Sequence, residues 1–336
     1  MLDLTHPKGE THLFKIIFRA TRKTRIVLCL TLQDDSNAET IMENVEQNSV
    51  RAWLLASRPK TLTGACIPVI AATAQAMCDG VFRWQPALVC LLFACLLQIA
   101  ANMINDLFDY LKGSDRSDRL GPERACAQGW ITVRVMRWGI ACVLTVACAL
   151  GCLLFFYGEA WVLLSIGVAC VVFAFLYTTL LSYCGMGDIL VLVFFGFVPV
   201  TGTYYVQAGC VTPSVWLTGA SVGILIDTLL VLNNFRDRDA DKLSGKRTLI
   251  VIFGERFGNL FYLFLGVVAW ACGLGLAVAG YVWVPVMTAL YLPVHYLTWR
   301  KMMAINRGRA LNAILGQTSM NMFLFGILMA IGFLLS

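Results

Sequence analysis

The last apolar stretch of the chain reads LNAILGQTSMNMFLFGILMAIGFLL over residues 311–335 and contains no charged residue. A run of about 20 such residues is long enough to cross a bilayer as a helix. Eight further apolar stretches precede it, and Pro68, Pro199, Pro285 and Pro293 inside them are tolerated in membrane bundles. We expect nine spans, at 61–78, 86–108, 136–157, 159–181, 187–206, 214–235, 257–280, 282–299 and 311–335. The sequence therefore predicts an all-α, polytopic membrane protein with nine transmembrane helices.

The composition of the whole chain supports this class. Of its 336 residues 59% are hydrophobic and 14% are charged, against about 45–50% and about 25% in an average soluble protein. These values exclude a soluble globular enzyme and a disordered chain. The 13 cysteines form no C-x-x-C pair and there are only 3 histidines, which argues against a zinc or iron–sulfur site.

Lysine and arginine residues gather in alternate loops between the expected spans. The rich set contains Arg51, Arg58, Lys60, Lys112, Arg116, Arg119, Arg124, Arg134, Arg236, Arg238, Lys242, Lys246, Arg247, Arg256, Arg300, Lys301, Arg307 and Arg309. The other set contains Arg83 alone. By the positive-inside rule the rich side is cytoplasmic. We therefore expect a multi-pass protein of the cell inner (plasma) membrane, with a cytoplasmic N-terminus and the C-terminus on the opposite side.

The N-terminal stretch 1–50 differs from the rest of the chain. Basic residues surround apolar pieces that are too short to span a bilayer, and the polar stretch 34–39 follows instead of a cleavage site for a signal peptide. We expect 1–50 to be a weakly ordered N-terminal extension. The part at 1–41 precedes Met42, which would itself serve as a start.

Two acidic clusters lie at the expected cytoplasmic ends of the second and sixth spans. The first reads NMINDLFD over 102–109, and the second reads NNFRDRDAD over 233–241. Both contain the pattern N-[DN]-x-x-D, which begins at Asn105 in the first copy and at Asn233 in the second. Because the copies are four spans apart, they have the same orientation in the membrane, as in a parallel internal repeat.

Each cluster suits the binding of a hard cation. Helical spacing places on one face Asn102, Asp106 and Asp109 in the first cluster and Asn233, Asp237 and Asp241 in the second. Carboxylates that converge on one cavity repel each other unless cations separate them. Oxygen ligands without His or Cys favour Mg²⁺ or Ca²⁺ over zinc. The interleaved basic residues predict that an anion also binds, and Mg²⁺ that bridges carboxylates to a diphosphate meets both requirements. The alternative is that the clusters are solvated loop ends.

These motifs resemble those of the UbiA family of intramembrane aromatic prenyltransferases, which carry two Asp-rich motifs in a nine-helix fold. The stretches RPKTL at 58–62, KGSDRSDRLGP at 112–122 and GKRTL at 245–249 are similar to the branch that prenylates 1,4-dihydroxy-2-naphthoate for menaquinone biosynthesis. The resemblance covers about residues 50–335. Gly113 stands where many relatives carry a third Asp, so Asp115 or Asp118 would take that role.

The resemblance implies roles for individual residues. The implied metal ligands are Asp106, Asp109, Asp115, Asp237 and Asp241. The implied substrate contacts are Lys60, Asn105, Lys112, Arg116, Asn233, Asn234, Arg238 and Lys246. Of all these, the resemblance marks as catalytic Asp106, Asp109, Asp237, Asp241 and Lys60. The implied cofactor is Mg²⁺.

The implied reaction moves a polyprenyl group from polyprenyl diphosphate to 1,4-dihydroxy-2-naphthoate, with loss of CO₂ and diphosphate, and gives demethylmenaquinone. Residues 51–336 would form this nine-helix transmembrane prenyltransferase domain, in contact with both substrates and the bilayer, and we expect no nucleic acid partner. One alternative keeps the chemistry but uses another acceptor, such as 4-hydroxybenzoate or homogentisate. Another class, a secondary transporter, would place its acids nearer the midplane than these clusters lie.

Some other polar residues have two interpretations. Asp227, near the middle of the sixth span, either has a functional role or forms a hydrogen bond that helps the helices pack. Asp188 either lines the mouth of the cavity or is a solvated loop acid. Aromatic side chains near span ends either shield a carbocation or form an interfacial belt, and these are Tyr177, Tyr183, Tyr204 and Tyr205. We expect His295 to be structural.

Overall fold

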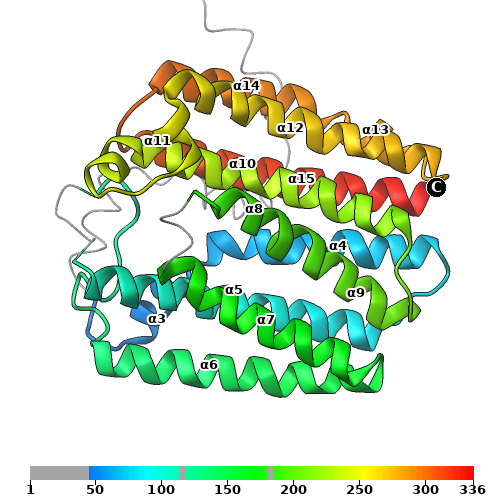
Figure 1. Cartoon of the computed structure of the whole chain (residues 1–336), viewed down its shortest axis with the longest axis horizontal. Helices are drawn as coiled ribbons and strands as arrows, with labels where there is room; N and C mark the ends of the chain where they lie inside the picture. Colours follow the sequence, from blue (N-terminus) through cyan, green and yellow to red (C-terminus); the bar gives the residue numbers. More distant parts are fainter. Residues whose placement is uncertain (1–44, 114–118, 180–184) are drawn as a thin grey trace, which may run out of the picture. The chain divides into compact units, whose positions relative to one another are not determined.

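The apolar stretches form helices throughout the residues that the computed structural model describes, which are 45–113, 119–179 and 185–336 (Figure 1). The elements are α3 (Val50–Ser57), η1 (Pro59–Thr61), α4 (Leu62–Cys78), α5 (Trp84–Leu111), α6 (Val133–Leu153), η2 (Leu154–Phe156), α7 (Ala160–Thr179), α8 (Gly187–Val191), the π-helical segment η4 (Leu192–Phe197), α9 (Val198–Ala208), α10 (Pro213–Leu243), α11 (Leu249–Phe253), α12 (Glu255–Val278), α13 (Trp283–Thr288), α14 (Tyr291–Ile305) and α15 (Leu311–Leu335). No strand occurs among them.

Among the described residues, seven helical segments are long and apolar enough to cross a membrane. They are Val50–Cys78, Trp84–Leu111, Val133–Phe156, Gly187–Ala208, Pro213–Leu243, Glu255–Val278 and Leu311–Leu335. The expected span at 159–181 coincides with α7, whose apolar part is shorter, and the one at 282–299 is broken between α13 and α14. The prediction of an all-helical, polytopic membrane protein is confirmed, and the count of nine spans stays a prediction.

The described part of the predicted N-terminal extension is short. Residues 1–44 lie outside the described range, and α3 begins at Val50. Before it, Gln47 donates a hydrogen bond from Nε2 to the carbonyl of Gly129 (3.1 Å), and the backbone N–H of Asn48 donates to the carbonyl of Trp130 (2.7 Å). The domain boundary at residues 50 and 51 stays a prediction.

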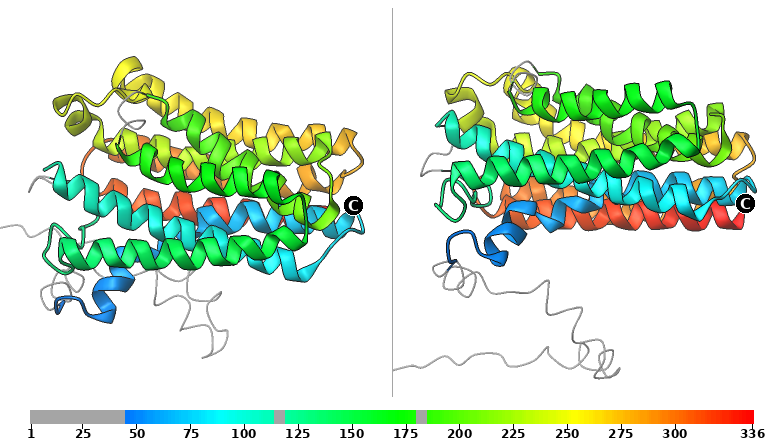
Figure 2. Two further views of the ribbon diagram at one scale, coloured as in Figure 1. Left: turned by 60° about the horizontal axis from the view of Figure 1, so that its bottom comes forward. Right: turned by 90° about the horizontal axis from the view of Figure 1, so that it is seen from below.

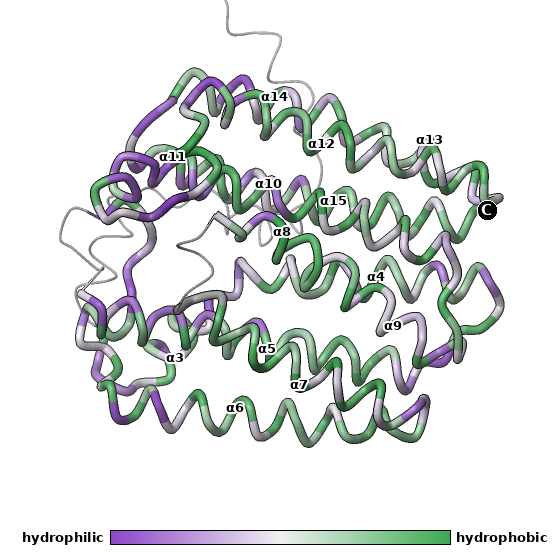
Figure 3. The backbone as a smooth tube through the Cα atoms, viewed as in Figure 1, coloured by the Kyte–Doolittle hydropathy of each residue, from purple (hydrophilic) through white to green (hydrophobic). Residues whose placement is uncertain are grey.

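The helices that carry the two acidic clusters finish at the same end of the bundle. In Figures 1 and 2, the C-terminal ends of α5 and α10 lie at the end that also carries α3 and α11, while the chain's C-terminus lies at the other end. Hydrophilic segments gather around α11 and at the end of α10, whereas the middle of the bundle is mostly hydrophobic (Figure 3). Both acidic clusters therefore lie near one face of the membrane.

A sharp bend after α3 sets the entrance to α4. Ser49 caps α3 by accepting a hydrogen bond on its side chain from the backbone N–H of Ala52 (3.2 Å). The helix ends at Arg58, whose φ of 50° is left-handed, and Pro59 follows, so the helix does not continue. This bend brings the Arg58 side chain to the end of α5.

Small residues let the η4 segment lie directly on α10. A Cβ added to Gly196 would lie 2.5 Å from the carbonyl oxygen of Gly219 and 2.7 Å from Cα of Gly223. Only glycine permits this approach, which is a common way for membrane helices to pack. The contact fixes α8, which leads into η4, against the middle of α10.

Candidate functional site

In the first acidic cluster, two side chains bind the surrounding backbone. Asp106 is 1% exposed, and its Oδ2 and Oδ1 accept hydrogen bonds from the backbone N–H groups of Ala125 (2.8 Å) and Cys126 (2.9 Å). Asn102 donates from Nδ2 to the carbonyl of Ser57 (2.9 Å) and to Oγ1 of Thr61 (2.8 Å). Asp106 therefore holds the 124–126 turn against α5 with both of its oxygens.

Asp109 lies one turn further along α5 and is paired with Arg124. The guanidinium of Arg124 donates to Oδ2 of Asp109, and it also donates to the carbonyl (2.5 Å) and Oδ1 (3.3 Å) of Asn105. The side chain of Arg124 is 5% exposed and that of Asp109 is 19% exposed. Asp109 therefore keeps access from outside while its charge is partly balanced.

Three arginines surround these two acids. The charge of Arg58 interacts with those of Asp106, Asp109, Arg119 and Arg124. Among the described residues, Nη2 of Arg58 is buried and has no hydrogen-bond partner. Positive charges outnumber negative ones here, so an anion that enters beside Arg58 would be stabilised.

The second cluster is organised by Arg236, which is 4% exposed. It donates to both oxygens of Asp237, from Nε at 2.8 Å and from Nη2 at 2.6 Å. It also donates to Oδ1 of Asn233 (2.7 Å) and Oδ1 of Asn312 on α15 (2.8 Å). This planar fork holds the Asp237 carboxylate in one orientation.

The same residues connect the second cluster to the segment that follows the first. Asn312 donates from Nδ2 to the carbonyl of Leu120 (2.8 Å). A Cβ added to the neighbouring Gly121 would lie 3.0 Å from Nη2 of Arg236. The structure thus brings together two clusters that are far apart in the sequence.

Asp241 lies one turn beyond Asp237 on α10 and is the least satisfied acid of the second cluster. Its Oδ1 is 3.5 Å from Nζ of Lys246, and its Oδ2 is buried without a hydrogen-bond partner among the described residues. The side chain of Asp237 is 28% exposed. These are two carboxylates one turn apart, one of which keeps an oxygen without a partner. Carboxylate oxygens are the type of ligand that Mg²⁺ prefers. No group of three acids, histidines or cysteines that could hold a metal occurs among the described residues.

Arg238, which we expected to contact substrate, is engaged by other groups of the protein. It donates to the carbonyl of Phe235 (2.6 Å), the carbonyl of Asn306 (3.0 Å) and Oε2 of Glu255 (3.1 Å). Its guanidinium carbon lies 4.2 Å from the ring centre of Phe235. These contacts fasten α10 to α12 and to the end of α14.

The structure describes some of the other predicted site residues and leaves two of them outside the described ranges. Lys60 is exposed in η1, just before α4, and Lys112 is exposed at the end of α5. Asn234 is buried on α10. Asp115 and Arg116 lie outside the described residues. Four residues of the site do not follow from the acidic spacing, and these are Arg58, Arg124, Arg236 and Asn312. Arg58 and Arg236 do stand inside the motifs RPKTL and NNFRDRDAD.

The aromatic candidates lie away from the clusters or outside the described side chains. Tyr204 and Tyr281 both donate from their hydroxyl groups to Asp79 (2.6 and 2.7 Å), at the opposite end of the bundle. The hydroxyl of Tyr205 accepts from the backbone N–H of Glu159 (3.1 Å). The side chains of Tyr177 and Tyr183 are not described. Neither Tyr204 nor Tyr205 is placed to shield a carbocation at the clusters.

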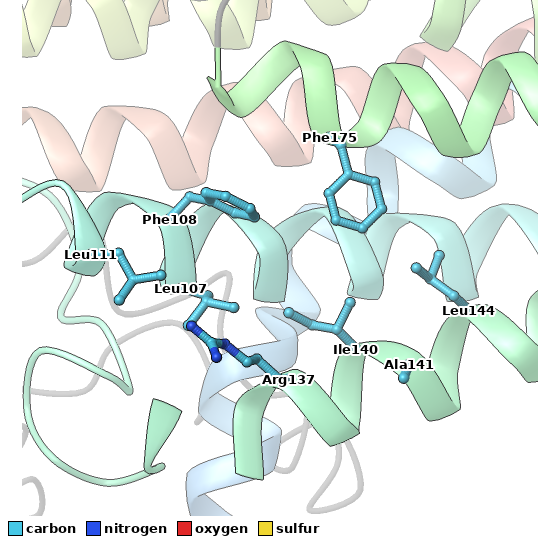
Figure 4. A pocket seen from close by; sticks show the side chains of 8 residues that line it. All are labelled: Leu107, Phe108, Leu111, Arg137, Ile140, Ala141, Leu144 and Phe175. Atoms are coloured by element: carbon cyan, nitrogen blue, oxygen red, sulfur yellow. The ribbon is translucent and has the colours of Figure 1, made fainter. Parts of the chain in front are cut away.

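An apolar groove lies beside the first cluster (Figure 4). It has a volume of about 380 Å³ and is lined by Leu107, Phe108, Leu111, Arg137, Ile140, Ala141, Leu144 and Phe175 of α5, α6 and α7. Among the described residues, Arg137 is the one charged residue that lines it, and no acid contributes. The groove suits a hydrocarbon chain and does not suit a metal-bound diphosphate.

Comparison with known proteins shows to which protein family the chain belongs. The profile of the UbiA prenyltransferase family matches residues 65–334. The chain belongs to the UbiA prenyltransferase family. The predicted resemblance is thereby confirmed. The family match also favours the prenyltransferase interpretation over the transporter alternative.

Curated relatives of this UbiA chain carry a more specific name. It is 37% identical over 226 residues to the 1,4-dihydroxy-2-naphthoate octaprenyltransferase of Escherichia coli (strain K12), covering 64% of this chain and 72% of the relative. The protein of the same name from Haemophilus influenzae is 33% identical over 300 residues, covering 85% and 96%. Both relatives are matched over more than two thirds of their length.

Solved structures share the fold at low sequence identity. The apo structure of a UbiA homologue from Aeropyrum pernix K1 has a TM-score of 0.62 at 17% identity, covering 81% of this chain and 97% of the other. A homologue from Archaeoglobus fulgidus bound to GPP and Mg²⁺ has a TM-score of 0.56 at 16% identity, covering 85% and 100%. The predicted UbiA-like bundle is confirmed.

Proposed function

We propose that this UbiA-family protein transfers a polyprenyl group from polyprenyl diphosphate to 1,4-dihydroxy-2-naphthoate, with release of diphosphate and CO₂. The two curated relatives described above are named for this activity, and the 112–122 stretch is similar to the same branch. The main support for the proposal is the pair of acidic clusters at one end of the bundle. A buried arginine hydrogen-bonds to a carboxylate of each cluster. Asn312 connects the second cluster to the segment that follows the first. The proposed product is a precursor of menaquinone.

Asp109, Asp237 and Asp241 are the proposed ligands of Mg²⁺. Each is partly accessible or keeps an unused oxygen, whereas both oxygens of Asp106 are engaged by the 124–126 turn. We therefore assign Asp106 a positioning role. When bound, Mg²⁺ supplies positive charge that stabilises the diphosphate as it leaves.

The surrounding cations complete the proposed diphosphate site. Arg58 offers a buried Nη2 without a partner among the described residues, and Lys246 lies beside Asp241. Arg124 and Arg236 orient the carboxylates and add positive charge near the leaving group. Preorganised donors of this kind stabilise charge that develops in the transition state. The remaining proposed substrate contacts are Asn105, Asn233, Asn234, Lys60, Lys112 and Arg116, and Asp115 remains a proposed metal ligand.

The proposed orientation places both clusters on the cytoplasmic side of the plasma membrane. The support for this is the Lys/Arg distribution, in which Arg83 alone occupies the opposite set of loops. A diphosphate ester and an aromatic carboxylate would then reach the site from the cytoplasm. The apolar chain of the first substrate would remain among helices and lipid.

Purified protein, polyprenyl diphosphate, dihydroxynaphthoate and Mg²⁺ test the proposal. We expect a prenylated product that has lost the carboxyl group, identified by its mass, and no product when EDTA removes the metal. The kcat/KM for dihydroxynaphthoate should exceed that for 4-hydroxybenzoate by about tenfold or more, because the site fits one ring system better. A product that keeps the carboxyl group, or equal use of both acceptors, would contradict the acceptor assignment.

A further inference from the structure

Two acidic side chains that the proposed metal site does not use lie on the neighbouring elements α8 and α10, deeper in the bundle. Asp227 lies on α10 and is 4% exposed, and Asp188 lies at the start of α8. The two carboxyl groups interact electrostatically. The adjoining backbone is close, because a Cβ added to Gly187 would lie 3.2 Å from Cδ2 of Leu230, one turn after Asp227.

Each member of this acid pair has an oxygen that the protein does not satisfy. Oδ1 of Asp188 and Oδ1 of Asp227 are buried, and neither has a hydrogen-bond partner among the described residues. The nearby hydroxyl of Thr228 donates to the carbonyl of Leu225 instead (2.6 Å). Buried polar groups in proteins are almost always paired, and acids within membrane spans commonly mark functional sites. The two free oxygens therefore indicate a polar ligand.

The position of the pair relates it to the proposed active site. Asp227, Asn234 and Asp241 follow one another at intervals of seven residues, so they share one face of α10. Asp227 lies ten residues before Asp237, which is about 15 Å along the helix axis toward the membrane interior. An acceptor that attacks the far side of the diphosphate ester would lie at this intermediate depth.

The chemistry of the pair favours a hydroxyl group over a metal ion as its ligand. A carboxyl group accepts a hydrogen bond when it is ionised and donates one when it is protonated. A pair that holds one proton therefore offers one acceptor and one donor, which matches a hydroxyl group. A hard cation would need further oxygen ligands, and no third acid joins the pair among the described residues.

We propose that Asp188 and Asp227 bind the C4 hydroxyl of the aromatic acceptor, which is the hydroxyl that is not adjacent to its carboxylate. This inference rests on the proposed function and deepens it, because it names the residues that select a dihydroxy acceptor. The hydroxyl donates to the ionised oxygen and accepts from the protonated carboxyl group. A site built to hydrogen-bond a substrate hydroxyl discriminates strongly against an analogue that lacks it.

The test compares dihydroxynaphthoate with 1-hydroxy-2-naphthoate, which lacks that hydroxyl, as a competitive inhibitor. Wild-type protein should bind the analogue about tenfold or more weakly than dihydroxynaphthoate. Asp227→Leu and Asp188→Leu, which remove the donor and acceptor groups, should bind the two compounds alike, with the KM for polyprenyl diphosphate unchanged within about twofold. Asp239→Leu is the matched control, because Asp239 is on the same helix with a side chain that is 69% exposed. It should behave as wild type.

Different results separate the two proposals. If the wild type does not prenylate dihydroxynaphthoate at all, the proposed function fails. If the wild type is active and both variants keep its discrimination against the analogue, the acid pair does not bind the hydroxyl. Should Asp227→Leu not fold, Asp188→Leu decides the matter alone, because Asp188 is only partly buried.

Discussion

The Asp106→Asn substitution should destabilise the fold without changing the affinity for Mg²⁺. The carboxylate of Asp106 accepts two backbone hydrogen bonds, from Ala125 at 2.8 Å and Cys126 at 2.9 Å, and the residue is 1% exposed. Asparagine keeps one acceptor oxygen and turns an NH₂ group toward the other N–H. One charge-assisted bond is lost and no water can replace it. We expect the free energy of unfolding to fall by about 2–3 kcal/mol.

The measurement is the melting temperature in detergent, with the Mg²⁺ concentration for half-maximal activity measured below that temperature. A loss of this size lowers the melting temperature by about 5 °C. Asp109→Asn is the matched control, since its side chain is 19% exposed. Its amide oxygen can still accept from Arg124, whose side chain is 5% exposed, and the substitution should raise the Mg²⁺ requirement. The positioning role would be refuted if Asp106→Asn melted like wild type while its Mg²⁺ requirement rose about tenfold.

Three further outcomes can be checked separately. Asp237→Asn should abolish turnover at saturating Mg²⁺ with little change in melting temperature, and activity that survives would show that the second cluster is structural. Gly266→Ala should destabilise by about 1–3 kcal/mol, because the added Cβ would lie 2.2 Å from Nε2 of His295; an unchanged melting temperature would contradict this packing. Cysteines placed at Arg83 and Lys246 should react with an impermeant reagent from opposite sides of the membrane, and labelling of both from one side would overturn the topology.

Hydropathy and charge were sufficient to predict the fold class, because the bilayer imposes spanning lengths on apolar helices. They could not predict how individual helices are interrupted. The expected span at 282–299 is divided between α13 and α14, although Pro285 and Pro293 lie inside these helices and not at the break. The π-helical turns at 192–197 depend on the contact of Gly196 with α10, which is a tertiary feature. Such features depend on neighbours that a hydropathy pattern does not reveal.

The acids of the candidate site were easier to predict than their partners. Repeated acidic spacing identified Asp109, Asp237 and Asp241, since helical geometry follows directly from the sequence. Arg124 could not be found in this way, because it reaches Asp109 from a loop 15 residues later. Likewise, Asn312 contacts Arg236 across 76 residues. Contacts between distant segments decide which acids remain available to a ligand.

The internal repeat contains a signal that distinguishes Asp106 from the proposed metal ligands. When the two copies are aligned on their shared pattern, Asp109 corresponds to Asp237, but Asp106 corresponds to Asn234. Asn234 has an amide and no carboxylate at this position. The proposed metal site of the second copy therefore uses no acid there. In the first copy, both oxygens of Asp106 accept hydrogen bonds from the 124–126 turn, which also contains Arg124. The two copies thus share one proposed ligand position, and Asp106 serves the loop that delivers Arg124 to Asp109.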